Sequence, residues 1–200
     1  MNRLSTETEY FKVSYNKTTT LSRYSTILFF AMIPFTTQRL TIRELNLADA
    51  PFILELVNTP GWLQYIGDRK IHSTIDAEKY LLEGPLNSYK KNGFGLYMVE
   101  RTQDNIALGI CGLLKREYLE FPDLGFAFLP EHFGHGYAYE ATDACLTMAT
   151  TTFGFNSVQA ITTPNNQSSI SLLKKIGFQF KSAMKDPASE AALSLFQRNQ

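Results

Sequence analysis

Two glycines, Gly134 and Gly136, stand where the sequence changes from a predicted strand to a predicted helix. Glycine allows the backbone to approach a ligand closely, and the first turn of a helix carries main-chain N–H groups without intrahelical partners. The positive end of the helix dipole lies at the same place. This order of residue types indicates a site for an anion such as a phosphate group.

The spacing of these glycines excludes two other nucleotide sites. The lysine and the longer glycine loop of a P-loop are absent, which excludes a nucleoside triphosphatase of that class. A dinucleotide-binding loop needs a third glycine at the position that Tyr139 occupies. Glycines after a strand can also form a simple turn, and at this point that alternative stays open.

The segment resembles the cofactor motif of the GNAT superfamily of N-acetyltransferases, most of all its RimJ/RimL-type branch. The branch reads Trp-Gly-x-Gly-Tyr-Ala-x-Glu-Ala, and residues 133–141 read Phe-Gly-His-Gly-Tyr-Ala-Tyr-Glu-Ala. A second match runs from Asn166 through Ser169 to Gly177-Phe178, and a weaker one comprises residues 39–43 with 49–50. Order and spacing agree from about Pro34 to the C-terminus, whereas the preceding residues have no counterpart.

The resemblance implies an α/β (α+β) fold, a single domain with a mixed, mostly antiparallel, twisted sheet flanked by helices. The strand at residues 126–128 would splay from the strand at Val158, and the pantetheine of acetyl-CoA would lie in the gap. Main-chain groups would hold the cofactor, together with the side chain of Asn166. The main-chain contacts would come from Phe126, Ala127, Phe128, Phe133, Gly134, His135, Gly136, Tyr137, Ala138 and Tyr139.

Acetyl transfer to an amine requires a base for the ammonium and a donor for the developing oxyanion. Asp123 is the candidate base, because histone-type members of the superfamily carry a glutamate at the corresponding start of the cofactor strand. Burial would raise its pKa towards neutral pH. The alternative is a solvated residue at the start of a strand. Glu117 and Glu120 are the next candidates, and an N–H near Phe128 would stabilise the oxyanion.

Many members of the superfamily use a tyrosine as the acid, four residues before the Gly-Phe pair. Leu173 occupies that position in this sequence. The nearest hydroxyl by motif belongs to Ser169, which would protonate or orient the departing thiolate. Alternatively, Ser169 is an ordinary polar residue in the first turn of a helix.

Other reactive residue types fit structural roles better. His132 and His135 lack a third ligand at suitable spacing, so no metal is expected. Cys145 belongs to an apolar stripe at helical spacing that begins at Ala141 and ends at Thr152, which predicts a core position. The two cysteines form no disulfide or zinc pattern, which suggests a reducing, cytoplasmic location. Three aromatic residues could line the acceptor pocket or belong to the core: Trp62, Tyr65 and Tyr80.

The elements that must position these residues alternate along the chain. Strands are expected at 40–43, 94–100, 106–114, 124–129 and 158–162 from their apolar patterns. Helices are expected from Asn46 to a stop at residues 59–61, from 75 to 91 with a break at Gly84-Pro85, at 137–153, and at 168–176. Residues 190–195 fit either a helix or an edge strand. Without internal repeats, this order predicts one mixed α/β layer domain.

Composition sets further limits. The chain has 200 residues, 44% of them hydrophobic, and 19 basic and 19 acidic residues leave a formal net charge of zero. No global field would draw it to nucleic acid or an anionic membrane.

The apolar run at residues 27–35 is shorter than the roughly 20 residues that span a bilayer, and it lies far from the terminus for a signal peptide. We expect residues 1–31 to be a poorly ordered extension and residues 32–200 to be the N-acetyltransferase domain, with Met32 a candidate start.

The sequence therefore predicts an acetyl-CoA-dependent N-acetyltransferase, monomeric or homodimeric, that acts by direct attack of a primary amine. The acceptor would be a protein N-terminus or a small amine, and the sequence does not choose between them. The competing hypothesis is a module that binds coenzyme A without turnover and serves as a sensor or a partner-binding subunit.

Overall fold

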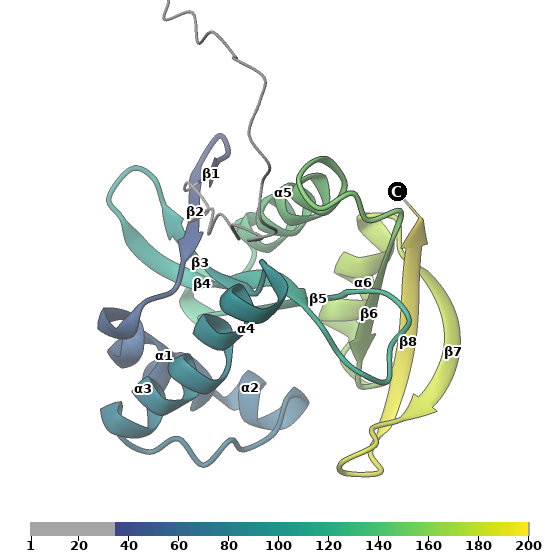
Figure 1. The fold of residues 1–200 in the computed structure, drawn as a ribbon, viewed down its shortest axis with the longest axis horizontal. Coiled ribbons are helices and arrows are strands. Elements are labelled where there is room, and N and C mark those ends of the chain that lie inside the picture. The colour runs from purple at the N-terminus through teal and green to yellow at the C-terminus, as the bar shows by residue number, and fades with distance from the viewer. Residues whose placement is uncertain (1–34, 200) are drawn as a thin grey trace, which may run out of the picture. The chain divides into compact units, whose positions relative to one another are not determined.

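The computed structural model describes residues 35–199. The predictions for residues 1–31 and for Met32 lie outside the described residues. Within the described part, one sheet has eight strands in the order β1-β2-β3-β4-β5-β6-β8-β7 (Figure 1). The strands are β1 (Phe35–Thr36), β2 (Leu40–Glu44), β3 (Leu96–Arg101), β4 (Ile106–Leu114), β5 (Asp123–Phe128), β6 (Ser157–Thr162), β7 (Gln179–Lys185) and β8 (Ala192–Asn199).

Six α-helices accompany this sheet in the described residues, and none of them is long and apolar enough to cross a membrane. Figure 1 shows α1 to α4 gathered together on one side of the central strands and α5 on the other. The helices are α1 (Ala50–Val57), α2 (Pro60–Tyr65), α3 (Thr74–Glu83), α4 (Pro85–Asn92), α5 (Tyr137–Thr151) and α6 (Gln167–Lys175), with short 3-10 helices η1 (Leu47–Asp49) and η2 (Pro130–His132).

The sheet is antiparallel except where β5 meets β6. That parallel pairing comprises the pair Asp123 and Gln159. Beyond it, β5 continues beside β4 while β6 continues beside β8. The predicted fold class, including the splayed central strands, is confirmed.

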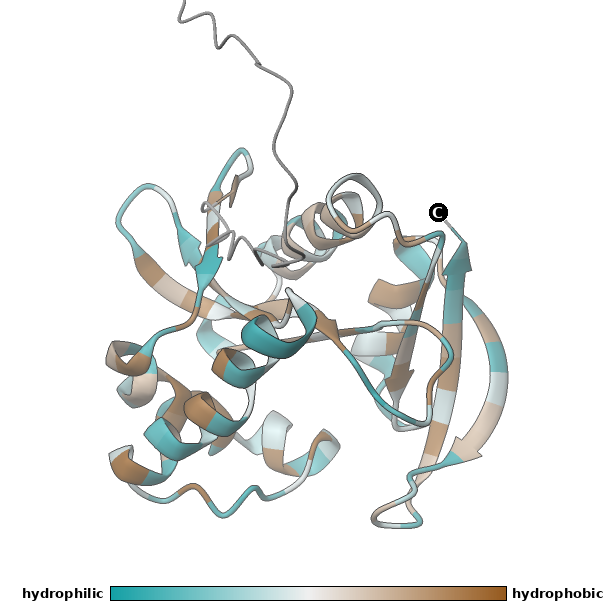
Figure 2. Ribbon diagram, viewed as in Figure 1, coloured by the Kyte–Doolittle hydropathy of each residue, from teal (hydrophilic) through white to brown (hydrophobic). Residues whose placement is uncertain are grey.

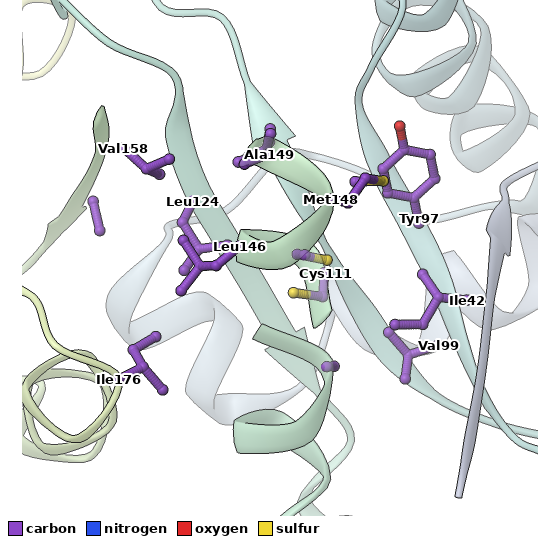
Figure 3. Close-up of a cluster of buried hydrophobic side chains, with 14 of the residues drawn as sticks. Ile42, Tyr97, Val99, Cys111, Leu124, Leu146, Met148, Ala149, Val158 and Ile176 are labelled. Carbon is purple, nitrogen blue, oxygen red and sulfur yellow. The ribbon is translucent and has the colours of Figure 1, made fainter. Parts of the chain in front are cut away.

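Alternate residues of β3 serve two separate cores. Tyr97 and Val99 belong to the cluster beneath α5, which Figure 3 shows together with Leu146 and Met148 of that helix (Figure 3). Met98, from the opposite face, packs with the residues of α1 and α3 in a second cluster. Figure 2 shows the corresponding hydrophobic segments on the central strands and on parts of the helices (Figure 2). This alternation follows from the two-residue period of a strand.

The helical connection contains one helix that the sequence did not predict. Asn46 caps a helix as expected, although the helix is the short η1 that leads into α1. The predicted stop at residues 59–61 is confirmed, because α1 ends at Val57. The same segment also begins α2, which was not predicted. The Thr59 hydroxyl accepts a hydrogen bond from the Trp62 N–H, and proline suits the first helical position. The predicted break at Gly84 is confirmed, because α3 ends and α4 begins there.

At the C-terminal end, the structure resolves the open choice for residues 190–195. Ala192–Asn199 form the strand β8, so the choice of a strand is right, but it is not an edge strand because it lies between β6 and β7. The sequence did not predict the edge strand β7. Nearly all its residues are exposed, so it carries no alternating hydrophobic pattern by which a strand is recognised.

Gly109 of β4 lies where β5 approaches closely. A Cβ atom at this position would collide with the main-chain oxygen of Ala127 and with the ring of Phe128. We therefore expect Gly109→Ala to lower the free energy of unfolding by about 1–3 kcal/mol, the usual cost of overpacking. Gly61→Ala is the control, because nothing lies within 4 Å of its Cβ position. Urea denaturation should show a lower midpoint for the first variant alone, and equal midpoints would contradict this account of the close approach.

Candidate functional site

The loop between β5 and α5 is built around two glycines in the left-handed backbone region. After η2, Gly134 and Gly136 both have φ of 79°, a conformation that side chains with a Cβ atom disfavour. Gly136 is also the N-cap of α5 and supplies no side chain to cap the helix. The predicted strand–loop–helix order is present, and the loop leaves the start of α5 uncapped.

The amides of this loop have no acceptor among residues 35–199. From Gly134 to Tyr139, none donates a hydrogen bond to another of the described residues. The next amide, that of Glu140, bonds to the Gly136 carbonyl. The amide of Phe133 is used by the Pro130 carbonyl at 3.1 Å, so this member of the predicted set is engaged. A run of unpartnered N–H groups at a helix N-terminus is suited to an anion.

An ion pair ties this loop to the beginning of β2. The Glu140 carboxylate accepts hydrogen bonds from the Arg39 Nε at 2.7 Å, the Arg39 N–H at 2.9 Å and the Thr37 hydroxyl at 2.5 Å. The Arg39 guanidinium also donates to the His135 carbonyl at 3.0 Å and lies 4.7 Å from the centre of the Tyr137 ring. In the sequence, Arg39 and Glu140 belong to two motifs about 100 residues apart, and nothing there indicates that they meet.

The free edge of β5 faces the gap towards β6. The Leu129 N–H donates to the Leu108 carbonyl of β4 at 2.9 Å. Main-chain groups alternate in direction along a strand, so those of Phe126 and Phe128 point away from β4 and into the gap. Those of Ala127 point at β4, opposite Ile110. Of the three predicted strand contacts, two offer their main chain to a ligand in the gap, and Ala127 does not.

Asp123 closes the narrow end of this gap. Its Oδ1 accepts the Ile161 N–H at 3.2 Å, and the Gln159 N–H donates to the Pro122 carbonyl at 2.8 Å. Its Oδ2 accepts the Arg116 Nε at 2.5 Å. The carboxylate therefore joins the two strands at the point where they part.

The Asp123 side chain is 2% exposed, so the alternative of a solvated carboxylate is wrong. Burial raises the pKa of Asp123 to about 6, although Arg116 and the Ile161 N–H act in the opposite direction. The other candidate bases, Glu117 and Glu120, are exposed. Arg116 was not predicted, because nothing in the neighbouring residues indicates its role. Its Nη1 also lies 3.2 Å from the Tyr118 hydroxyl.

At the start of α6, one of the two polar atoms of the Asn166 side chain is already hydrogen-bonded within the protein. Its Oδ1 accepts the Ser169 N–H at 3.1 Å and caps the helix. Its Nδ2 and the Ser169 hydroxyl donate to no other described residue, and the nearby Thr163 hydroxyl is buried without a partner. Leu173 is 1% exposed in the core and carries no proton to donate.

The remaining candidates have structural positions. Cys111 and Cys145 are both buried, and burial raises the pKa of the Cys111 thiol. The predicted inward stripe ends at Met148, because Thr152 is exposed. Trp62 is buried in the core beneath α1 and α3. Among residues 35–199, no group of three or more His, Cys, Asp or Glu side chains is placed to hold a metal ion.

With the splayed strands and the glycine loop described, comparison with known sequences identifies the family to which this fold belongs. Residues 39–179 match the family described as "Acetyltransferase (GNAT) domain". The chain belongs to this family and is an acyltransferase. Its relatives include the uncharacterized N-acetyltransferase p20 of Bacillus licheniformis, 25% identical over 75% of this chain and 84% of p20. The uncharacterized protein YkkB of Bacillus subtilis is 30% identical over 50% of this chain, and the match spans 60% of YkkB.

Solved structures share the fold at lower identity. An acetyltransferase from Agrobacterium tumefaciens superposes with a TM-score of 0.73 at 21% identity, covering 86% of this chain and 98% of the other. RimL, a ribosomal L7/L12 alpha-N-protein acetyltransferase in complex with coenzyme A, superposes with a TM-score of 0.71 at 15% identity. The match covers 82% of this chain and 95% of RimL. A spermidine N-acetyltransferase, SpeG of Vibrio cholerae, superposes with a TM-score of 0.65 at 19% identity. The match covers 82% of this chain and 95% of SpeG.

The environment of Asp123 predicts its titration. We expect its carboxyl carbon signal in NMR to titrate near pH 6, and Arg116→Gln to move the midpoint higher, since Arg116 lowers this pKa. Asp104 is the internal control, because its pKa lies below the usual value owing to the hydrogen bond from Arg101 at an exposed site. A titration midpoint for Asp123 below that of Asp104 would contradict the raised pKa of Asp123.

The same pKa has a consequence for stability. The folded chain holds this proton more tightly than the unfolded chain, whose pKa is near 3.8. The contribution of Asp123 to stability is therefore greatest below about pH 4 and declines as the pH rises to about 6.

Proposed function

We propose that this protein transfers the acetyl group of acetyl-CoA directly to a primary amine. The observation that carries the proposal is the run of unpartnered amides from Gly134 to Tyr139, beside a gap into which a free strand edge opens. Those amides would hold the diphosphate of coenzyme A. The family to which the chain belongs is consistent with this cofactor.

The cofactor arm would lie in the gap between β5 and β6. The main-chain groups of Phe126 and Phe128 would pair with the pantetheine like an added strand. The Nδ2 of Asn166 would donate to a carbonyl of the arm, because its oxygen already caps α6. Ala127 would form part of the wall without donating its amide.

In the proposed reaction, Asp123 accepts a proton from the ammonium of the acceptor, directly or through water. The pKa of about 6 leaves it ionised at neutral pH. The neutral amine attacks the thioester carbon, and the N–H of Phe128 stabilises the oxyanion. The C–S bond then breaks, and the extra proton on the attacking nitrogen passes to the thiolate. The Ser169 hydroxyl is the proposed donor, which gives its own proton to the thiolate and takes up the one from the nitrogen, or it orients the thiolate.

The proposed branch is the RimJ/RimL type, and the acceptor is either a protein N-terminus or a small amine. The solved structures support each choice, because RimL is named as acting on ribosomal L7/L12 and SpeG as a spermidine acetyltransferase. Their identity to this chain is 15% and 19%. The acceptor therefore has to be found by experiment.

Two observations favour a second candidate function, a module that binds coenzyme A without turnover. Leu173 occupies the position at which the resemblance expects a tyrosine acid, and it is buried in the core. Asp123 is also held on both oxygens, by Arg116 and by the Ile161 N–H. A carboxylate held in this way would serve equally well to join two strands.

A panel of amines separates the two functions. We expect calorimetry to show coenzyme A binding, and we expect thiol release from acetyl-CoA with at least one of three acceptor types: an N-terminal peptide, a polyamine or an aminoglycoside. Asp123→Asn should lower the release about 100-fold or more, the usual contribution of a general base, while coenzyme A still binds. Binding with no release on any amine would favour the second candidate, and no binding at all would exclude both.

The loop predicts a specific block. Gly136→Trp would set an indole among the unpartnered amides, so we expect it to weaken coenzyme A binding at least about 10-fold, as expected for the loss of a charge-assisted contact. Gly154→Trp is the matched control. Gly154 lies just beyond the other end of α5, also has a positive φ of 67°, and has nothing within 4 Å of its Cβ position. Equal binding by the two variants, measured by calorimetry, would count against the proposed position of the diphosphate.

A further inference from the structure

A carboxylate lies unexpectedly close to the proposed anion site. Glu140 is in the first turn of α5, directly after the unpartnered amides of residues 134–139. A carboxylate near a helix N-terminus is favourable for an empty helix. A second anion at the same terminus would be repelled by it, and a coenzyme A diphosphate carries two negative charges. The site therefore needs a device that removes the effect of the Glu140 charge.

The surroundings of Glu140 supply such a device. Its side chain is 17% exposed, and the Thr37 hydroxyl, the Arg39 N–H and the Arg39 Nε all donate to it. Burial alone would raise the pKa of Glu140, but these hydrogen bonds outweigh it, and the pKa lies below its usual value. Glu140 is thus a carboxylate at neutral pH, and Arg39 is its cationic partner.

Arg39 also touches the loop itself. Its guanidinium donates to the His135 carbonyl at 3.0 Å and lies over the ring of Tyr137. It lines a hollow of about 400 Å³ together with Gly136, Tyr139, Glu140 and Lys175. One side chain thus contacts both the carboxylate and the loop with the free amides.

We infer that Arg39 is a positioning residue for the cofactor, which cancels the negative charge of Glu140 and so leaves the N-terminus of α5 attractive to the diphosphate. The inference rests on the proposed function. The hydrogen bond to His135 and the contact with Tyr137 keep the guanidinium in the place where it does this. Arg39 does not need to touch the cofactor.

A purely structural latch would behave differently from a charge-cancelling residue. If the ion pair only held the loop in shape, removing either partner would weaken binding. If Arg39 cancels a charge, removing Arg39 exposes the carboxylate, whereas replacing Glu140 by its isosteric amide removes the repulsion. The two substitutions then have different effects, and the second should repair the first.

The experiment is a double-mutant cycle with coenzyme A as the probe, measured by calorimetry on the full chain. We expect Arg39→Ala to weaken binding about 10-fold, in line with an opposed charge at a helix N-terminus. Glu140→Gln should bind at least as tightly as the wild type. The double variant should return to within about threefold of it, as expected when the coupling lies in one charge pair.

The control is Lys185→Ala, which removes a cation from an exposed pair with Glu190 in the connection between β7 and β8. This variant should leave the affinity for coenzyme A unchanged. Such a result would show that losing a surface cation elsewhere does not weaken binding. If Arg39→Ala proves unstable in thermal melts, Arg39→Lys is measured in its place. This variant keeps the charge, so it should bind coenzyme A within a few-fold of the wild type.

Each outcome has a definite meaning. Weaker binding by Glu140→Gln, or a double variant no better than Arg39→Ala, would overturn the inference and leave a structural latch. Unchanged binding by Arg39→Ala would also overturn it. A wild-type protein that binds no coenzyme A would instead contradict the proposed function, and this result is distinct from the other three.

Discussion

The parallel pairing of β5 with β6 ends at Asp123 and Gln159, and the candidate site depends on this early divergence. A sheet normally satisfies the main-chain groups of its interior strands on both edges. Here β5 is interior, yet beyond Asp123 one edge lacks a strand partner among the described residues. The gap therefore offers a row of hydrogen-bonding groups to an extended ligand, in the same plane as the strands. The two helices that follow β5 and β6, α5 and α6, begin with the loop amides and with Asn166.

The divergence needs a firm point from which the strands part, and buried polar groups provide it. Asp123 bonds to the amide of Ile161 in β6 and to Arg116 from the preceding connection. A buried carboxylate is costly unless it is paired, and this pairing holds the strands together at one residue while they separate at the next. The same charge is the candidate base, so the group that defines the shape of the gap would also take part in the chemistry.

Local patterns were sufficient to predict the elements that carry the site. The apolar run of residues 106–114 matches β4, and the glycines before Tyr137 mark the start of α5, because both signals come from neighbouring residues. The ion-pair partners of the charged residues at the site could not be predicted in this way. Arg39 meets Glu140, and Arg116 meets Asp123, only after the chain has folded. β7 was missed for another reason, since an edge strand with nearly every residue exposed has no hydrophobic period.

The order of the last strands has a consequence for how the gap comes into being. β8 follows β7 in the sequence but lies between β6 and β7 in the sheet. While the chain is being synthesised, β6 has no neighbour on its outer side until residues 192–199 have left the ribosome. One wall of the candidate gap therefore depends on a strand that is made after it. The proposed coenzyme A site would therefore be complete only once residues 192–199 have paired with β6.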